Sequence, residues 1–174
     1  MKKIALIGTH AVGKTTICHE LVASLKKKGI NAEYLVEIAR EAQKAGFKLN
    51  EQTTKESQKW ILHTQIAREI EFETRPDAEF LLCDRSVLDN YVYYINQFGV
   101  DAVLDKMINT HMKTYGFLFK VPINPKFLTP DKVRSVDPLF QKKIDELLEK
   151  ELIKRKINFQ NYPGLEPAMK TILM

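Results

Sequence analysis

The residues whose types and spacing are most clearly suited to a chemical role form one segment near the start of the chain, from Gly8 to Thr15. Their spacing follows the pattern G-x-x-x-x-G-K-[ST], which is typical of a loop that binds the phosphates of a nucleoside triphosphate. Gly8 and Gly13 permit backbone conformations that turn successive N–H groups toward one anion. Lys14 is placed to reach the β and γ phosphates, and the Thr15 hydroxyl can bind Mg²⁺. The segment therefore predicts triphosphate binding.

The remaining positions of this loop present mainly backbone, so we expect phosphate contacts along its whole length and into the helix that follows. The predicted phosphate-binding residues are Gly8, Thr9, His10, Ala11, Val12, Gly13, Lys14, Thr15 and Thr16. A catalytic role for His10 is an alternative. At such a position, however, we expect a histidine on the surface or rim of the loop.

A second pair of candidates, Asp84 and Arg85, follows an apolar run at residues 80–83. A carboxylate at the end of an apolar strand can bind Mg²⁺ directly or through water, so Asp84 joins Thr15 as a predicted metal-binding residue. Hydrolysing ATPases often place a glutamate after that acid to activate water, whereas Arg85 is suited to holding phosphate charge. The guanine-reading tetrapeptide N-K-x-D of GTPases does not occur. The pair favours a kinase over an ATPase or a GTPase switch; a local ion pair that caps the strand is the structural alternative.

These residues must be positioned by alternating strands and helices. Short apolar runs predict strands at residues 4–7, 31–36, 80–83, 116–121 and 156–160. Helical spacing and cap residues predict helices at residues 14–28, 37–45, 51–74, 86–98 and 100–113, from 137 onward and after 164. The alternation predicts an α/β sandwich with a mostly parallel sheet and ligands at the carboxyl ends of its strands. We expect one domain over residues 1–174, with a lid-like loop around residues 122–137.

Three segments resemble the nucleoside and nucleotide kinase branch of P-loop proteins: residues 4–16, 37–41 and 84–86. Within that branch the chain is similar to small ATPase/kinase domains related to nicotinamide riboside, thymidylate and deoxynucleoside kinases. Residues 131–137 match the lid region where such kinases place phosphate-binding arginines. The resemblance implies a three-layer P-loop NTPase sandwich, with ATP as the donor and Mg²⁺ as the metal.

The resemblance also implies roles around the phosphoryl acceptor. Glu37 resembles the acid that lies near the acceptor hydroxyl as a general base, and a solvated acid at a helix N-terminus is its alternative. Arg40, one turn later, could hold substrate or pair with Glu37. Arg85 and Arg134 are the candidates for stabilising charge on the transferring phosphoryl group, although Arg134 could also be an exposed loop arginine. Because the lid holds a single arginine, a nucleoside-like hydroxyl acceptor is favoured over a monophosphate.

The predicted helix at residues 51–74 carries two further candidates. Deoxynucleoside kinases use a helical glutamine to read a base, so Gln58 and Gln65 are candidate substrate-binding residues, with a solvated helix face as the alternative for both. Three tyrosines that follow Arg85 could form an aromatic substrate wall, but core packing is favoured for them: Tyr91, Tyr93 and Tyr94.

The net charge of +5 and the pI near 9.1 suit an anionic partner, which nucleotides satisfy as well as DNA does. A nucleic-acid partner is therefore open but not favoured. No apolar run approaches the length of a membrane span, and we expect a cytoplasmic protein. A homodimer is left open. The leading function is an ATP-dependent kinase of a nucleoside, nucleotide or related metabolite; the alternatives are a nucleic-acid kinase and a non-catalytic, regulatory P-loop ATPase module.

Overall fold

One parallel sheet organises the chain. The computed structural model describes residues 1–127 and 137–174, and its five strands lie in the order β2-β3-β1-β4-β5 with every neighbouring pair parallel. The strands are β1 (Lys2–Ile7), β2 (Ala32–Leu35), β3 (Phe80–Asp84), β4 (Tyr115–Lys120) and β5 (Gln160–Asn161). The predicted α/β class and five-stranded sheet are confirmed, and β1 to β4 lie close to their predicted positions.

The fifth strand corrects a prediction. β5 is two residues long and begins at Gln160, whereas a strand was expected over residues 156–160. Lys156 has a φ of +54°, and the Ile157 N–H donates to the Leu152 carbonyl oxygen at 3.0 Å. This left-handed residue and long-reaching bond are those of a Schellman helix end. Residues 156–157 therefore complete the preceding helix, and the chain becomes extended only after them.

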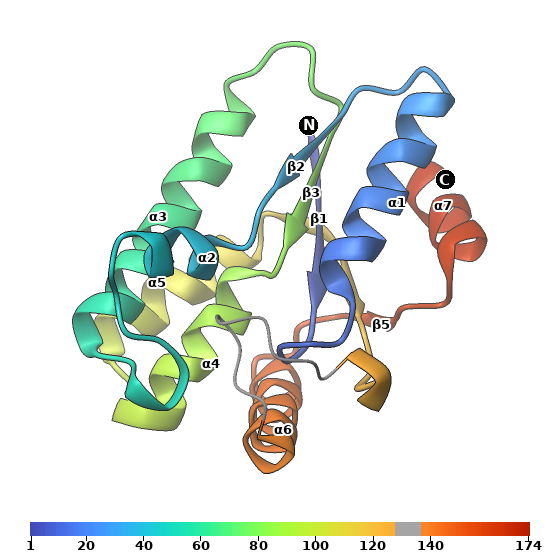
Figure 1. Cartoon of the computed structure of the whole chain (residues 1–174). Helices are drawn as coiled ribbons and strands as arrows, with labels where there is room; N and C mark the ends of the chain where they lie inside the picture. Colours follow the sequence, from blue (N-terminus) through green and yellow to red (C-terminus); the bar gives the residue numbers. More distant parts are fainter. Residues whose placement is uncertain (128–136) are drawn as a thin grey trace.

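Helices cover both faces of the sheet (Figure 1). Their bounds are α1 (Lys14–Lys27), α2 (Ile38–Lys44), α3 (Lys55–Glu73), α4 (Val87–Phe98), α5 (Ala102–Met112), α6 (Pro138–Lys154) and α7 (Leu165–Leu173). Helices α1 and α7 lie on one face, α3, α4 and α5 on the other, and α6 runs beneath the carboxyl ends of the strands. α3 begins later than predicted because Thr54 caps it, accepting the Ser57 N–H at 3.2 Å, after a 3-10 turn at Asn50–Gln52.

The central strand β1 is apolar on both sides because both of its faces are covered. Ile4 and Leu6 pack in the cluster formed with α1 and α7, while Ala5 and Ile7 pack in the cluster formed with the opposite helices. β1 lies between β3 and β4, so the loop that leaves its carboxyl end runs beside Asp84 at the end of β3. The core thus brings the two motifs of the sequence to one edge of the sheet.

The segment between β4 and α6 is described only in part. It forms a 3-10 turn at Pro125–Phe127, and residues 128–136 lie outside the described residues, Arg134 among them. A lid at residues 122–137 and a single domain over residues 1–174 stay predictions. Over residues 1–127 and 137–174, no helix combines the length and apolar character needed to cross a bilayer.

Candidate functional site

The loop after β1 has the geometry that its glycines suggest. Gly8 has a φ of +139°, and a Cβ there would lie 2.7 Å from the Val121 carbonyl oxygen. Gly13 has a φ of +94° at the N-cap of α1, and a Cβ there would lie 3.2 Å from the Phe127 ring. Both positions therefore disfavour a side chain on conformation, and at Gly8 the Val121 carbonyl group also leaves no space for one. The loop delivers backbone N–H groups to the N-terminus of α1, where an anion is favoured.

The side chain of Lys14 lies along its own loop. Its Nζ donates to the carbonyl oxygens of Gly8 at 2.8 Å and Thr9 at 2.5 Å. Burial, together with the nearby charge of Arg85, lowers the pKa of Lys14 to about 8. A buried ammonium that is bonded only to neutral carbonyl groups is poorly compensated, so an anion at the loop would stabilise its charged form.

Thr15 and Asp84 meet as the sequence predicts for a magnesium site. The Thr15 hydroxyl donates to Asp84 Oδ2 at 2.5 Å, and the Tyr34 hydroxyl lies 3.3 Å from the same oxygen. Hydroxyl and carboxylate oxygens are hard ligands, and Mg²⁺ in phosphoryl-transfer sites usually takes one or two carboxylates plus phosphate and water. The donor set of this corner therefore fits Mg²⁺ next to a bound triphosphate.

Arg85 and Glu37 form a buried ion pair beside the loop. Arg85 Nε donates to Glu37 Oε1 at 2.8 Å, and Arg40 Nε lies 3.4 Å from Glu37 Oε2. Arg85 has a φ of +106°, a strained value for a bulky residue that costs about 1–3 kcal/mol. Its Nη1 is buried and has no hydrogen-bond partner among the described residues. The alternative of a solvated Glu37 is excluded because the side chain is only 4% exposed.

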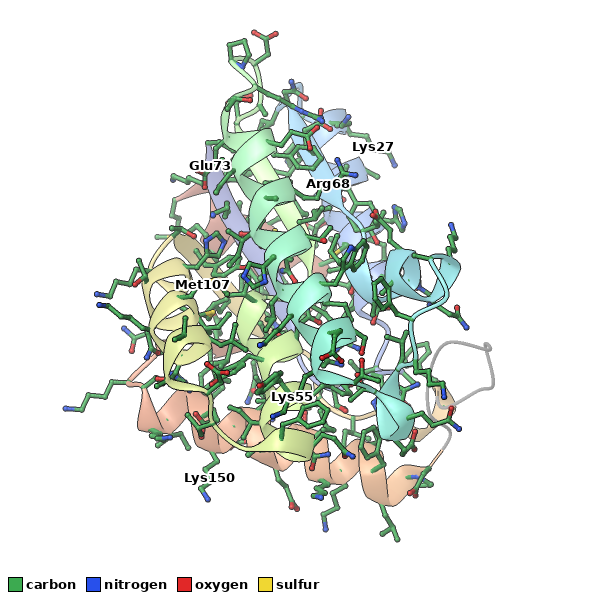
Figure 2. All side chains as sticks on the ribbon, turned by 90° about the vertical axis from the view of Figure 1, so that its left-hand side faces the viewer. Lys27, Lys55, Arg68, Glu73, Met107 and Lys150 are labelled. Atoms are coloured by element: carbon green, nitrogen blue, oxygen red, sulfur yellow. The ribbon has the colours of Figure 1, made fainter. Side chains whose placement is uncertain are left out.

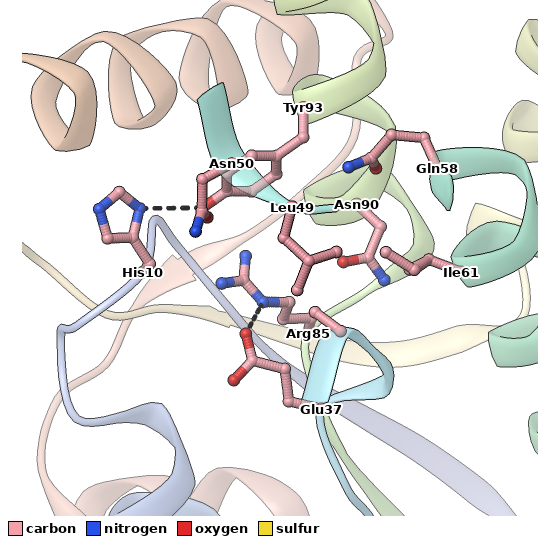
Figure 3. A pocket seen from close by; sticks show the side chains of 10 residues that line it. His10, Glu37, Leu49, Asn50, Gln58, Ile61, Arg85, Asn90 and Tyr93 are labelled. Carbon is pink, nitrogen blue, oxygen red and sulfur yellow. Dashed lines mark hydrogen bonds and ion pairs between the residues drawn. The ribbon is translucent and has the colours of Figure 1, made fainter. Parts of the chain in front are cut away.

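A pocket opens against this ion pair (Figure 3). It is lined by His10, Glu37, Ala39, Leu49, Asn50, Gln58, Ile61, Arg85, Asn90 and Tyr93. Its cavity volume of about 30 Å³ has room for one or two water molecules. Leu49 and Asn50, from the segment between α2 and α3, form part of its wall. A nucleoside-sized molecule would therefore have to displace part of that wall.

His10 corrects the expectation of a surface or rim histidine, because its side chain is buried. Its Nδ1 lies 3.0 Å from the Tyr93 hydroxyl, and its ring packs on Phe140 with centroids 5.7 Å apart. Gln141 at the start of α6 donates from Nε2 to the His10 carbonyl oxygen at 2.8 Å. His10 thus fixes the loop to α4 and α6, and it also lines the pocket.

The two candidate glutamines of α3 differ in their surroundings, although both are buried and the solvated helix face is wrong for each. Gln58 lines the pocket, and its Nε2 donates to the Thr53 hydroxyl at 2.8 Å. Gln65 does not line the pocket, and its Nε2 donates to the Arg85 carbonyl oxygen at 2.9 Å. The tyrosines pack in the core as expected, and Tyr93 also lines the pocket.

Sequence reasoning missed two buried residues of α4. Asn90 lines the pocket. Asp89 accepts the Gly8 N–H on Oδ1 at 2.8 Å and the Ser86 N–H on Oδ2 at 2.9 Å. The spacing Ser-x-x-Asp after Arg85 is that of a capping box and could have identified Asp89. Nothing comparable in the sequence identifies Asn90, whose position depends on the packing of α3 against α4.

Comparisons with known proteins agree with this fold. A family model described as an AAA domain matches residues 3–164. The NadR protein in complex with NR superposes with a TM-score of 0.75 at 16% identity, over 98% of this chain and 50% of that chain. The chain thus spans about half the length of the NadR structures that it matches.

Two smaller kinases match along their whole length. Thymidylate kinase from Ehrlichia chaffeensis superposes with a TM-score of 0.66 at 12% identity, over 99% of this chain and 98% of that chain. Deoxyadenosine kinase from M. mycoides with bound dATP gives 0.59 at 15% identity, over 100% of both chains. No curated protein sequence matches significantly. At these identities the likeness establishes a P-loop kinase-like fold.

Proposed function

The chain belongs to the AAA domain family, and we propose that it is a P-loop kinase that transfers the γ-phosphoryl group of ATP to a small acceptor. One observation carries the proposal: the pocket is bounded on one side by His10 of the phosphate-binding loop and on another by the Arg85–Glu37 ion pair. An acceptor in this pocket would lie next to a bound triphosphate and against the carboxylate and guanidinium of that ion pair.

The donor side would be held by the loop and the start of α1. The backbone from Thr9 to Thr16 would supply N–H groups, because the Gly8 N–H is already bonded to Asp89. Lys14 would leave the carbonyl oxygens of Gly8 and Thr9 to reach the β and γ phosphates. Thr15 and Asp84 are the residues that would hold Mg²⁺, directly or through water. The metal would supply neutralisation of the charge on the phosphate oxygens.

The acceptor side would use Glu37 and Arg85. The Glu37 carboxylate is fixed by Arg85 and Arg40, so it can orient the acceptor hydroxyl and accept its proton. Arg85 has a buried N–H at Nη1 with no partner among the described residues, which can stabilise charge on the transferring group. We retain Arg134 as a second candidate for that role; it lies outside the described residues.

The substrate class that we propose is a nucleoside or a related hydroxyl-bearing metabolite. The amide groups of Gln58 and Asn90 can read a polar edge, and the apolar walls of Leu49 and Ile61 can pack on a ring. Relatives of the same fold include proteins whose structures hold NR and dATP. We retain ATP as the donor and the cytoplasm as the location, with nucleic acid as a less favoured acceptor.

The proposal is tested with γ-labelled ATP and a panel of acceptors: nucleosides, nucleoside monophosphates, nicotinamide riboside and DNA ends. Label transfer to a small acceptor is the expected result. Transfer to DNA ends alone, falling steeply with salt, would favour the nucleic-acid kinase. ATP binding without transfer to any acceptor would overturn the kinase and leave a regulatory module.

The role of Glu37 gives a sharper prediction. Glu37→Gln should lower kcat by about 100-fold, the range of a lost general base, while ATP affinity changes little because no donor contact is removed. The readouts are kcat on the acceptor and the dissociation constant of ATP. Glu41→Gln, one turn along α2, is the matched control and should match the wild-type rate. A fully active Glu37→Gln would refute the assignment.

A further inference from the structure

We propose that Gln65 and Asp89 are positioning residues that grip the Arg85–Ser86 peptide from its two sides and thereby aim the Arg85 guanidinium into the acceptor pocket. This inference rests on the proposed kinase function, because it assigns Arg85 a task in transfer. Neither residue lines the pocket, so each would act through Arg85 rather than on the substrate.

The peptide that they grip follows a strained residue. Arg85 has a φ of +106°, which a bulky side chain adopts only when its surroundings hold it there. The Arg85 carbonyl oxygen accepts from Gln65 Nε2 at 2.9 Å. The Ser86 N–H on the other side of the same peptide donates to Asp89 Oδ2 at 2.9 Å. Both polar groups of the strained peptide are therefore fixed by buried side chains.

The amide of Gln65 can take only one orientation. Its Nε2 also donates to Glu69 Oε1 at 3.0 Å, and its Oε1 accepts from Asn90 Nδ2. A flipped amide would place its oxygen against the Glu69 carboxylate and the Arg85 carbonyl group, and both contacts would be repulsive. Gln65 is consequently set as a donor to Arg85, and the same amide holds Asn90 at the pocket wall.

Glu69 is itself immobilised, one turn further along α3, the helix that runs down the face shown in Figure 2 from Glu73 to Lys55. Lys3 Nζ lies 3.1 Å and His111 Nε2 lies 2.7 Å from Oε2, while the Tyr115 hydroxyl donates to Oε1 at 2.6 Å. These partners come from β1, α5 and β4. The acceptor side is therefore connected to β1, β4 and α5 through Gln65 and Glu69.

Asp89 also holds the phosphate-binding loop. Its Oδ1 accepts the Gly8 N–H at 2.8 Å, at the point where the phosphate-binding loop leaves β1. One carboxylate therefore joins the first residue of the donor loop to the peptide that carries Arg85. Because in-line transfer depends on placement within about an ångström, a shared anchor between donor and acceptor sides fits the proposed reaction.

The first test uses the protein without ligand and needs no acceptor. The ¹H–¹⁵N signal of Arg85 Nε, identified by its loss in Arg85→Lys, reports the ion pair with Glu37. In Gln65→Met its hydrogen exchange should be at least tenfold faster than in wild type, and Asp89→Asn should shift it in the same direction. Gln58→Met, which removes a buried amide of the same helix that donates to the Thr53 hydroxyl rather than to the Arg85 carbonyl oxygen, should leave the exchange unchanged.

The second test asks whether Gln65 acts through Arg85. Gln65→Met should lower kcat at least tenfold with the KM for ATP within twofold, and Gln65→Asn, whose amide is too short, should not rescue it. Added to Arg85→Lys, Gln65→Met should cause no further loss; multiplied losses would overturn the proposal. Unchanged Arg85 exchange in both Gln65→Met and Asp89→Asn would also overturn it. Faster exchange in a protein that phosphorylates no acceptor would keep the grip and refute the kinase function.

Discussion

Two buried ion pairs, linked by the Gln65 amide between Glu69 and the Arg85 carbonyl group, are completed to different extents. Near the amino ends of the strands, Lys3 pairs with Glu69, whose two oxygens together receive Lys3, His111, Tyr115 and Gln65. At the carboxyl ends, Arg85 pairs with Glu37, but Arg85 Nη1 has no partner among the described residues. Both pairs are shielded from water, so burial alone does not separate them.

The difference indicates which pair serves structure and which is prepared for a ligand. A buried carboxylate with all its hydrogen bonds made is held in its charged form: burial raises the pKa of Glu69, but the bonds from His111 and Tyr115 and the charge of Lys3 leave it below its usual value. An incompletely bonded guanidinium in the interior costs free energy that a ligand oxygen would recover. The incompletely bonded Arg85 guanidinium lies at the pocket beside the phosphate-binding loop.

The largest effect on kcat is expected at the Arg85–Glu37 pair, whose hydrogen bonds are incomplete. Arg85→Met should lower kcat for acceptor phosphorylation by about 1,000-fold, the lower end of the range for an arginine that stabilises transferring charge. The loss should appear in kcat more than in the KM for ATP. Arg68→Met, an exposed arginine of α3, is the control and should retain the wild-type rate. If the kcat of Arg85→Met were within tenfold of wild type, Arg85 would serve the stability of the fold, as Lys3 does, and not catalysis.

Disruption of the Lys3–Glu69 pair should instead lower the stability of the fold. Lys3→Met removes the lysine partner of the buried Glu69 carboxylate, so it should lower the free energy of unfolding by about 3 kcal/mol. Denaturation by urea measures that loss, and kcat at a temperature where the variant is folded should stay within twofold of wild type. Lys2→Met, its exposed neighbour, should change neither value. A large loss of kcat in folded Lys3→Met would show that the Lys3–Glu69 pair also controls the position of Arg85 through Gln65.

A smaller effect should appear when Lys14 of the phosphate-binding loop is titrated. Lys14 has a pKa of about 8 and binds phosphates as the ammonium ion, so above that pH the free protein must take up a proton in order to bind ATP. Affinity for ATP should therefore fall about tenfold between pH 7 and pH 9. Calorimetry in buffers of different ionisation enthalpy measures the proton uptake. A pH-independent affinity with no proton uptake would show that Lys14 stays charged in the free protein.

The donor side could be predicted from sequence because its signals are local. The loop from Gly8 to Thr15 lies within eight consecutive residues, and Asp84 directly ends its strand. The order of strands and helices follows from short-range patterns of the same kind. The start of β5 was predicted too early, because a left-handed Lys156 in a helix end cannot be distinguished from the start of a strand by composition.

The acceptor side could not be predicted to the same extent because it is made by packing. The burial of Gln58 and Gln65 depends on how α3 meets α4, and a polar pattern on a helix reads as a solvated face until its partner is known. His10 was expected at the rim because the sequence gives no sign that α6 closes over the loop. The burial of a polar residue by partners distant in sequence therefore cannot be predicted from the sequence alone. Gln65 and Asp89, which are proposed to position Arg85, are residues of this kind.

The most direct test of the central claim is to follow where the label of γ-labelled ATP goes when the acceptor panel is added. We predict that label appears on a small hydroxyl-bearing acceptor, that transfer disappears in Lys14→Ala, and that it falls steeply in Arg85→Met. Label released only as free phosphate, at a rate unaffected by any acceptor, would contradict the claim that the pocket beside the loop is a phosphoryl-acceptor site.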